Sequence, residues 1–263
     1  MSETSNDLRP TPGERFRATM STPDARGSLA LGIVATLATA AAGLWWFPST
    51  MPEVMSDEAE AGIETIVNLT VIASPVVGVV LGITAYAFLN RHKGSEPPQE
   101  DGPAIRTNAP AVLTWTVVSS LFCTLAVVWG LAELGGGETK ALAYGKDAVV
   151  IEVTGSQWVW TYRYPEAGVE SHELVMPVNT PVLFKVTSAD VTHSFWPVQL
   201  GVKINANKGV TTTAFTIPTE VGGIDIHCAE LCGLYHAYMA NEGRIVMPNE
   251  YQQWLDEQKA ASA

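Results

Sequence analysis

The chain has few charged residues, and few of those are cations. Asp, Glu, Lys and Arg make up 16% of its 263 residues, against roughly 25% in a typical soluble protein. Its 15 Lys and Arg stand against 27 Asp and Glu, which gives a net charge of −12. This balance excludes a nucleic-acid partner, because phosphate binding needs a surplus of cations. The apolar fraction of 47% excludes a disordered chain and favours a membrane protein.

Cysteine is also scarce, and three cysteines exclude a small disulfide scaffold. Cys228 and Cys232 nevertheless lie close together among other soft ligands, which points to a metal. The sequence lacks a nucleophile–base arrangement and the intramembrane histidines that would hold a heme. These absences argue against a catalytic centre within this chain.

Three stretches without charged side chains, at about 27–47, 65–90 and 107–132, are long enough to cross ~30 Å of hydrocarbon. Lipid offers no hydrogen-bond partners, so each is expected to be a helix. Together they define a transmembrane region over 27–134. Pro75 predicts a kink in the second span, and Gly78 and Gly82 form a Gly-x-x-x-Gly pair that would seat another helix closely.

Orientation follows from the cations, because Lys and Arg stay on the cytoplasmic side. All seven cations before Glu133 lie either in the tail, residues 1–26, or between the second and third spans, whereas the 49–62 loop has none. We therefore expect a multi-pass protein of the cell membrane whose C-terminal domain is on the outer, periplasmic side. A cleavable signal peptide, residues 1 to about 42, is the alternative interpretation of the first span; it leaves two spans and the same final topology.

After the third span the sequence changes character. The glycines at 135–137 predict a flexible linker over 135–142. Residues 143–263 contain short runs rich in Val, Ile, Thr and aromatics, separated by turn formers, which is typical of an antiparallel β-sandwich or barrel. A final helix is expected over Asn249–Lys259, with Asn249 as its cap.

Five soft ligands gather in this outer domain. Cys228, Cys232, His236 and Met239 share one short segment, and His193 precedes them at a strand end. Thiolates, imidazoles and a thioether on a β-scaffold suit copper. A single-copper site would use one cysteine, so the second indicates two coppers bridged by both thiolates, each completed by one histidine. Zinc is the alternative, since two Cys and two His satisfy its tetrahedral coordination, but it would leave Met239 unused.

The motif Cys-x-Glu-x-Cys-x-x-x-His-x-x-Met after His-Ser-Phe-Trp resembles the copper-A (CuA) domain of cytochrome c oxidase subunit II. The likeness runs from about residue 108 to the C-terminus and implies a cupredoxin-like Greek-key sandwich on membrane helices. It implies that Met239 and the carbonyl of Glu230 are weak copper ligands. It also implies that the Glu230 side chain reaches a magnesium ion at the interface with the catalytic subunit, and that Trp158 is the residue at which electrons enter.

The resemblance implies a subunit that takes electrons from a cytochrome c-type donor and passes them to heme in the catalytic subunit I of a heme-copper terminal oxidase, alongside other integral membrane subunits. Val159, Arg163 and Asn205 replace a tyrosine and two acids that are common in the family, which puts the usual donor in doubt. In the third span, Val112 and Ser119 replace a glutamate and a proline, and that glutamate lies near a proton path.

Two other functions stay open at this point. Val112, together with the replacements Val159, Arg163 and Asn205 on the face that docks the donor, favours the CuA-bearing subunit of a nitric oxide reductase of the heme-copper superfamily. A copper carrier or sensor without an enzyme partner is the third hypothesis, and three membrane spans with packing glycines argue against it.

Overall fold

A computed structural model describes residues 21–90, 109–144 and 147–262 of the 263-residue chain. Most of the expected cytoplasmic tail and the cations between the second and third spans lie outside the described residues. The chain divides into two compact units, residues 1–51 with 63–101 and residues 52–62 with 102–263.

The first unit is helical. Its first helix runs continuously as α2 (Pro23–Ala41), one π-helical turn η1 (Ala42–Trp46) and α3 (Phe47–Thr50), and the second is α4 (Asp57–Leu89). The Thr22 side chain caps α2 by accepting a hydrogen bond from Ala25 N–H, as an N-cap residue does. Both helices are long and apolar enough to cross a membrane, and both extend beyond the spans expected from the uncharged stretches.

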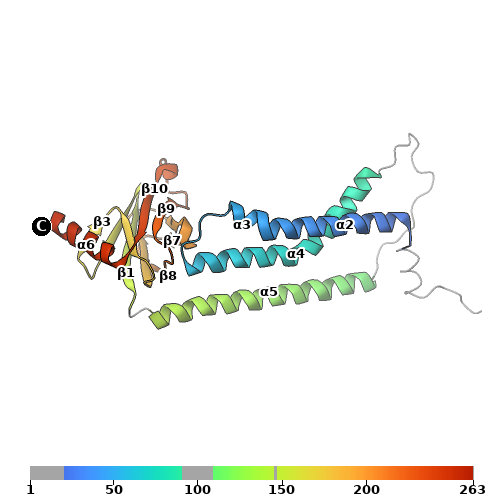
Figure 1. Cartoon of the computed structure of the whole chain (residues 1–263), viewed down its shortest axis with the longest axis horizontal. Helices are drawn as coiled ribbons and strands as arrows, with labels where there is room; N and C mark the ends of the chain where they lie inside the picture. The colour runs from blue at the N-terminus through green and yellow to red at the C-terminus, as the bar shows by residue number, and fades with distance from the viewer. Residues whose placement is uncertain (1–20, 91–108, 145–146, 263) are drawn as a thin grey trace, which may run out of the picture. The chain divides into compact units, whose positions relative to one another are not determined.

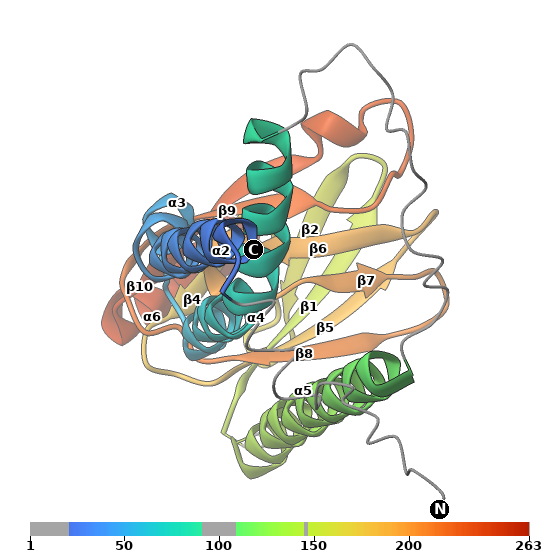
Figure 2. The same ribbon diagram turned by 90° about the vertical axis from the view of Figure 1, so that its right-hand side faces the viewer.

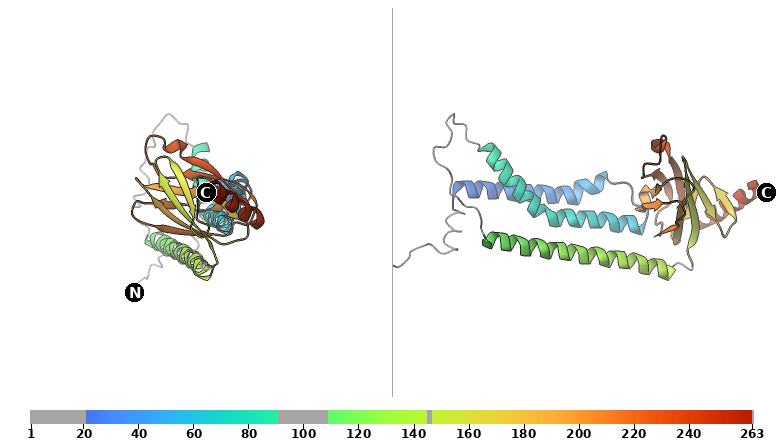
Figure 3. Two further views of the ribbon diagram at one scale, coloured as in Figure 1. Left: turned by 90° about the vertical axis from the view of Figure 1, so that its left-hand side faces the viewer. Right: turned by 180° about the vertical axis from the view of Figure 1, so that it is seen from behind.

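Glycines let α2 and α4 approach closely, as the Gly-x-x-x-Gly pair predicts. A Cβ added at Gly82 would lie 2.3 Å from the Cα of Gly32, and one at Gly78 would lie 2.0 Å from the hydroxyl oxygen of Thr36. The two helices run side by side in Figure 3. Close backbone packing of this kind drives helix association where there is no water to exclude.

The expected kink is present in α4. Pro75 lies inside this helix, where its ring removes one backbone donor and pushes against the preceding turn. The helix changes direction part way along (Figure 1).

The helix α5 (Ala109–Tyr144) contains the third membrane-spanning candidate, Val112–Ala132. It continues through residues 135–142, where the sequence predicts a flexible linker, so that prediction differs from the structure. Each glycine in a helix interior costs only about 1 kcal/mol relative to alanine, and good helix formers on both sides offset this.

The C-terminal part is a sandwich of two five-stranded sheets, several strands of which are labelled in Figure 2. One sheet has the order β3-β2-β1-β5-β8, with strands β1 (Val149–Ser156), β2 (Val159–Tyr164), β3 (Val169–Ser171), β5 (Val182–Ser188) and β8 (Thr212–Thr216). The other has the order β4-β10-β9-β6-β7, with strands β4 (Leu174–Pro177), β6 (His193–Pro197), β7 (Ile204–Ala206), β9 (Gly222–Cys228) and β10 (Ala240–Val246).

The sandwich is not purely antiparallel, which corrects the expectation from the sequence. β1 pairs with β5, and β4 with β10, in parallel. The strand end expected at His193 is present, because β6 begins there, but β3, β4 and β7 were not expected. These three strands have three or four residues, and β4 is buried along its whole length, so they are too short or too buried to show the alternation of apolar and polar residues that identifies a half-exposed strand.

Aromatic rings fill the space between the sheets near the end that carries the ligands. Phe195 contacts Phe184 and Trp160 edge-on, with ring centroids 5.2 and 5.4 Å apart. All three side chains are at most 2% exposed. Such edge-to-face contacts stabilise a core beyond simple area burial, which gives His193, at the start of β6, a rigid support.

The C-terminal helix α6 (Pro248–Ser262) covers the other end of the sandwich. It packs Trp254 edge-on against Tyr164 at 5.0 Å. The helix begins at Pro248, one residue before the expected cap Asn249, because the fixed φ of proline suits the first helical position.

The segment 52–62, which the sequence places in the loop after the first span, forms part of the second unit. Met55 is 2% exposed, and its backbone bonds to Gln199 and Thr219 of the sandwich at 3.0 and 2.9 Å. The Ser56 hydroxyl donates to the Leu200 carbonyl at 2.8 Å. The loop after the first span therefore lies on the same side of the membrane as the sandwich, as the distribution of cations predicts.

Candidate metal centre

Three segments meet at one end of the sandwich. β6 begins at His193, β9 ends at Cys228, and the segment from Ala229 to Met239 connects β9 to β10. This ligand loop is closed at its base by a hydrogen bond from Cys228 N–H to the Met239 carbonyl, at 3.0 Å. Residues from distant parts of the sequence are thus held by neighbouring strands of one sheet.

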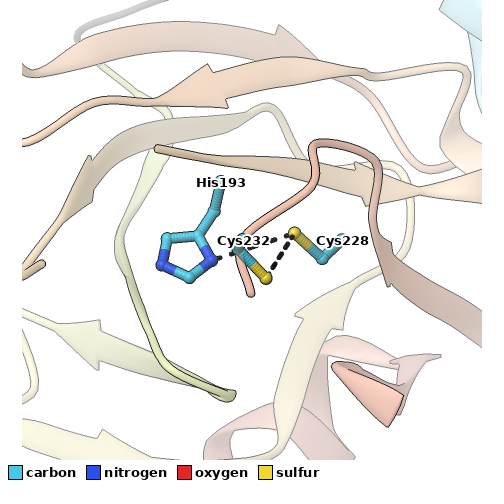
Figure 4. Close-up of side chains that lie close together, drawn as sticks. All are labelled: His193, Cys228 and Cys232. Carbon is cyan, nitrogen blue, oxygen red and sulfur yellow. Dashed lines mark hydrogen bonds between the residues drawn. The ribbon is translucent and has the colours of Figure 1, made fainter. Parts of the chain in front are cut away.

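The two buried thiols lie close together (Figure 4). Their sulfur atoms are 3.7 Å apart, too far for a disulfide, whose S–S bond is about 2.05 Å. A metal ion with bonds of about 2.3 Å to sulfur would reach both. Burial and the neighbouring Cys228 raise the pKa of the Cys232 thiol to about 11, so a cation is needed to hold Cys232 as a thiolate near neutral pH.

His193 points one ring nitrogen at the sulfurs and the other at a carboxylate. Its Nδ1 lies 3.1 Å from the Met239 Sδ and 3.8 Å from the Cys228 Sγ, whereas Nε2 lies 2.8 Å from the Asp190 Oδ1. The ligand atoms of His193, Cys228 and Cys232 all lie within 4.8 Å of one another. A proton on Nε2 that is donated to Asp190 leaves the Nδ1 lone pair free for a metal, as is usual for ligating histidines.

Asp190 is suited to accept the hydrogen bond from His193 Nε2 because its carboxyl group is an anion near neutral pH. Burial alone would raise the pKa of its carboxyl, but hydrogen bonds from His193 and from the backbone N–H groups of Gln157 and Val191 outweigh this effect and lower it to about 2. The carboxylate thereby fixes the orientation of the His193 ring, whose side chain is fully buried.

The remaining expected ligands surround the same sulfurs. His236 Nδ1 lies 3.5 Å from the Cys232 Sγ, and Met239 Sδ lies 3.7 Å from that sulfur. The Glu230 carbonyl lies 3.2 Å from the Cys228 Sγ, while the Glu230 side chain is exposed. The structure therefore brings every expected ligand to the cysteine pair, with His193 and His236 beside different thiols.

This donor set fits copper. Two thiols, two imidazole nitrogens and a thioether are soft or borderline ligands, the types that copper prefers. Zinc in a structural site needs four ligands, whereas here the buried Met239 sulfur is a fifth donor turned inward. His227, the residue before Cys228 in β9, is exposed, and its ring centroid lies 6.1 Å from that of Trp196.

A glycine makes room for the buried histidine. A Cβ added at Gly155 in β1 would lie 2.9 Å from Trp160 Cζ3 and 3.1 Å from the His193 ring, closer than a side chain tolerates without a shift of its neighbours. The ring of His193 thus fits because β1 carries no side chain at this position.

Trp158 lies in the turn between β1 and β2, beside the ligand loop. Its ring meets Tyr235 of that loop edge-on, with centroids 4.7 Å apart. Gly233, two residues before Tyr235 in the same loop, also lies beside this turn, since a Cβ there would lie 2.7 Å from the Gln157 Nε2 and 3.4 Å from the Trp158 ring. The residue expected to receive electrons is therefore in direct contact with the segment that carries the ligands.

The positions that depart from the family pattern are partly exposed or on the surface. Val159 is 42% exposed, and Asn205 pairs with Ser194 between β7 and β6. Arg163 forms an ion pair with Glu152 at 3.2 Å across β1 and β2, so a partner acid on the same sheet offsets its charge.

Sequence reasoning missed Asp190, Gln157 and Gly155. Asp190 stands three residues before His193, a spacing that carries no signal by itself, because the contact depends on the turn between β5 and β6. Gln157 and Gly155 lie on the opposite sheet from the cysteines, so only the packing of the two sheets brings them to the site.

Two sheets packed face to face, with a buried Cys, His and Met cluster where strands and one loop meet, form a cupredoxin-like domain, here following apolar helices. Residues 168–246 match the family described as "Cytochrome C oxidase subunit II, periplasmic domain". Cytochrome c oxidase subunit 2 of Synechocystis sp. is 27% identical over 90% of this chain and 83% of its own length. The protein of the same name from Thermostichus vulcanus is 30% identical over 70% of this chain and 58% of its own length.

Among solved structures, the periplasmic domain of subunit II of cytochrome oxidase (CoxB) of Bradyrhizobium japonicum is 32% identical, covering 44% of this chain and 96% of that chain, with a TM-score of 0.42. The chain is similar to the cytochrome c oxidase subunit II family, over residues 168–246 to the family itself and over most of its length to the Synechocystis protein. It is a membrane protein whose C-terminal domain faces outward, and the comparisons do not favour the nitric oxide reductase alternative.

Proposed function

We propose that this chain is the subunit through which electrons enter a heme-copper terminal oxidase of the plasma membrane. It accepts one electron at a time from a cytochrome c-type donor on the outer side and delivers it to heme in catalytic subunit I, where dioxygen is reduced. The cluster of two thiols, two imidazoles and a thioether at one end of the sandwich carries this proposal. The chain itself is the non-catalytic, electron-transferring subunit.

The contacts around the cysteine pair support these ligand assignments. Cys228, Cys232, His193 and His236 would hold a dinuclear copper CuA centre, with both thiolates shared between the two coppers and one histidine for each copper. Met239 and the Glu230 carbonyl complete the ligand set. Copper bound there would supply one-electron redox chemistry, and sharing the electron over two coppers and two sulfurs would keep the changes in bond length small.

The protein's own task is to keep this geometry fixed. Burial of His193, both cysteines and Met239 excludes water from the sulfurs, and the strand ends hold the ligands before any metal arrives. Such preorganisation lowers the structural change that each electron transfer requires. Trp158, packed on the ligand loop, receives the electron from the donor.

Two surfaces serve the partners. The exposed carboxylate of Glu230 leaves the cluster toward solvent and contributes to a magnesium site at the interface with catalytic subunit I. On the donor side, Val159 and the paired Arg163 reduce the negative charge that would steer a basic cytochrome, since steering depends on complementary charge. The donor therefore docks with little dependence on ionic strength.

The test is purification of the complex from the native membrane through a tag on this chain. We expect heme and copper to copurify, and reduced cytochrome c-type donors to transfer electrons to the complex. Cys232→Ser should remove the copper spectrum and electron uptake, whereas Cys123→Ser, in α5, should preserve both. Normal copper without any copurifying heme would contradict the proposal and indicate a copper carrier.

A further inference from the structure

We propose that Gln157 is a positioning residue that locks the β1–β2 turn onto the ligand loop and so fixes Trp158 relative to Cys232. This inference deepens the proposed function and rests on it, because Gln157 would hold the metal ligands and the residue that receives electrons in one geometry.

Gln157 bonds to both sides of the cluster at once. Its side-chain Nε2 donates to the Cys232 carbonyl at 2.7 Å, and its backbone N–H donates to the Asp190 Oδ2 at 2.7 Å. The other carboxylate oxygen of Asp190 accepts from His193 Nε2 at 2.8 Å. Gln157, in the turn that joins β1 to β2, thus connects directly to Cys232 and, through Asp190, to His193, two ligand residues that lie on separate segments.

The ligand loop is shaped to accept this side chain. Gly233, next to Cys232, has a φ of +125°, and a Cβ there would lie 2.7 Å from Gln157 Nε2. A glycine at this position satisfies both requirements, since other residues rarely adopt this conformation and would displace the amide.

The loop needs such a bond because its own side chains hold it weakly. Leu231 and Leu234 are 78% and 82% exposed, so apolar burial contributes little at the outer part of the loop. Tyr235 contacts Trp158, which itself sits beside Gln157 on the turn. The Gln157 amide is therefore the polar link between the main chain of the loop at Cys232 and the turn.

The experiment compares the full chain with Gln157→Met, which keeps the side-chain length and removes the donor. Gln253→Met, on the surface of α6, is the matched control, because its amide bonds only within the helix to Glu257. In the metal-free chain, amide hydrogen exchange of residues 231–234 should accelerate about two- to tenfold, as expected for one net hydrogen bond. The thermal unfolding of the sandwich should stay unchanged.

The copper-loaded chain gives a second measurement. Gln157→Met should still bind copper in the wild-type ratio, but it should lose copper to a chelator about two- to tenfold faster and shift the visible absorption bands. A merely structural role would lower the unfolding temperature without moving these bands. The control variant should match the wild type in all of these measurements.

Gly233→Ala, Gln157→Met and the double variant together form a double-mutant cycle. Gly233→Ala should accelerate exchange like Gln157→Met, and the double variant should be no worse than the more severe single variant, because both remove the same bond. Unchanged exchange in Gln157→Met, or effects of the two variants that multiply, would overturn the inference. If the wild-type chain binds no copper, the proposed function fails, while the exchange measured without metal still decides the role of Gln157.

Discussion

Replacing Gly155 with alanine tests whether the sandwich, and not the ligand loop alone, sets the position of His193. The added methyl would lie 2.9 Å from Trp160 Cζ3 and 3.1 Å from the His193 ring. Trp160 is 2% exposed and packs on Phe195, so its ring has no free space into which it could move away from the methyl group. The His193 ring must therefore move, and its Nδ1 moves away from the sulfurs.

The magnitude follows from the cost of adding a methyl to a close-packed interior, which is typically about 1 to 3 kcal/mol. In the metal-free protein, the His193 ring can turn and so relieve the clash. When copper binds, Nδ1 must point at the metal again, so the free energy of the clash reduces the affinity for copper. Copper affinity should drop by about fivefold to a hundredfold, since 1.4 kcal/mol corresponds to tenfold.

The assay is a competitive copper titration of the full-length chain against a chelator of known affinity, with thermal unfolding measured in parallel. Gly223→Ala is the control, because a Cβ at that position meets nothing within 4 Å. Equal copper affinities of Gly155→Ala and Gly223→Ala would refute the reasoning and show that the loop alone orients the histidine.

Three further predictions concern residues around this site and the core. Trp158→Phe should slow electron uptake from the external donor without changing the copper content, and unchanged turnover would remove its assigned role. Tyr164→Phe should destabilise the sandwich by about 2 to 4 kcal/mol in chemical denaturation, because its hydroxyl both accepts from Val175 N–H and donates to the Val175 carbonyl in a buried position; a loss below 1 kcal/mol would contradict this. Burial raises the pKa of Tyr251 from 10.0 to about 12, so its stabilising contribution is complete below pH 10 and is lost as the pH rises toward 12. Tyr251→Phe should accordingly make the unfolding temperature less sensitive to pH in this window, and an unaltered pH profile would argue against it.

Much of this protein could be predicted from its sequence because two strong signals are local. Uncharged runs of membrane-spanning length identified all three helices, and the spacing of Cys228, Cys232, His236 and Met239 placed these ligands in one loop. Their proximity needed only that His193 begin a neighbouring strand.

The rest depended on contacts that the sequence does not encode locally. The hydrogen bond between His193 and Asp190, which determines the ring nitrogen that faces the sulfurs, is set by a turn. The role of Gly155 appears only when the two sheets are packed together. Likewise, the sequence predicts that Met55 is a loop residue, yet it is buried because its backbone forms hydrogen bonds to Gln199 and Thr219 of the sandwich.

The copper content of the full-length chain tests the central claim most directly. After reconstitution with copper under reducing conditions, elemental analysis should find two copper ions per chain, and one or none in Cys232→Ser. A single ion per wild-type chain, or zinc retained in preference to copper, would contradict a dinuclear centre bridged by Cys228 and Cys232.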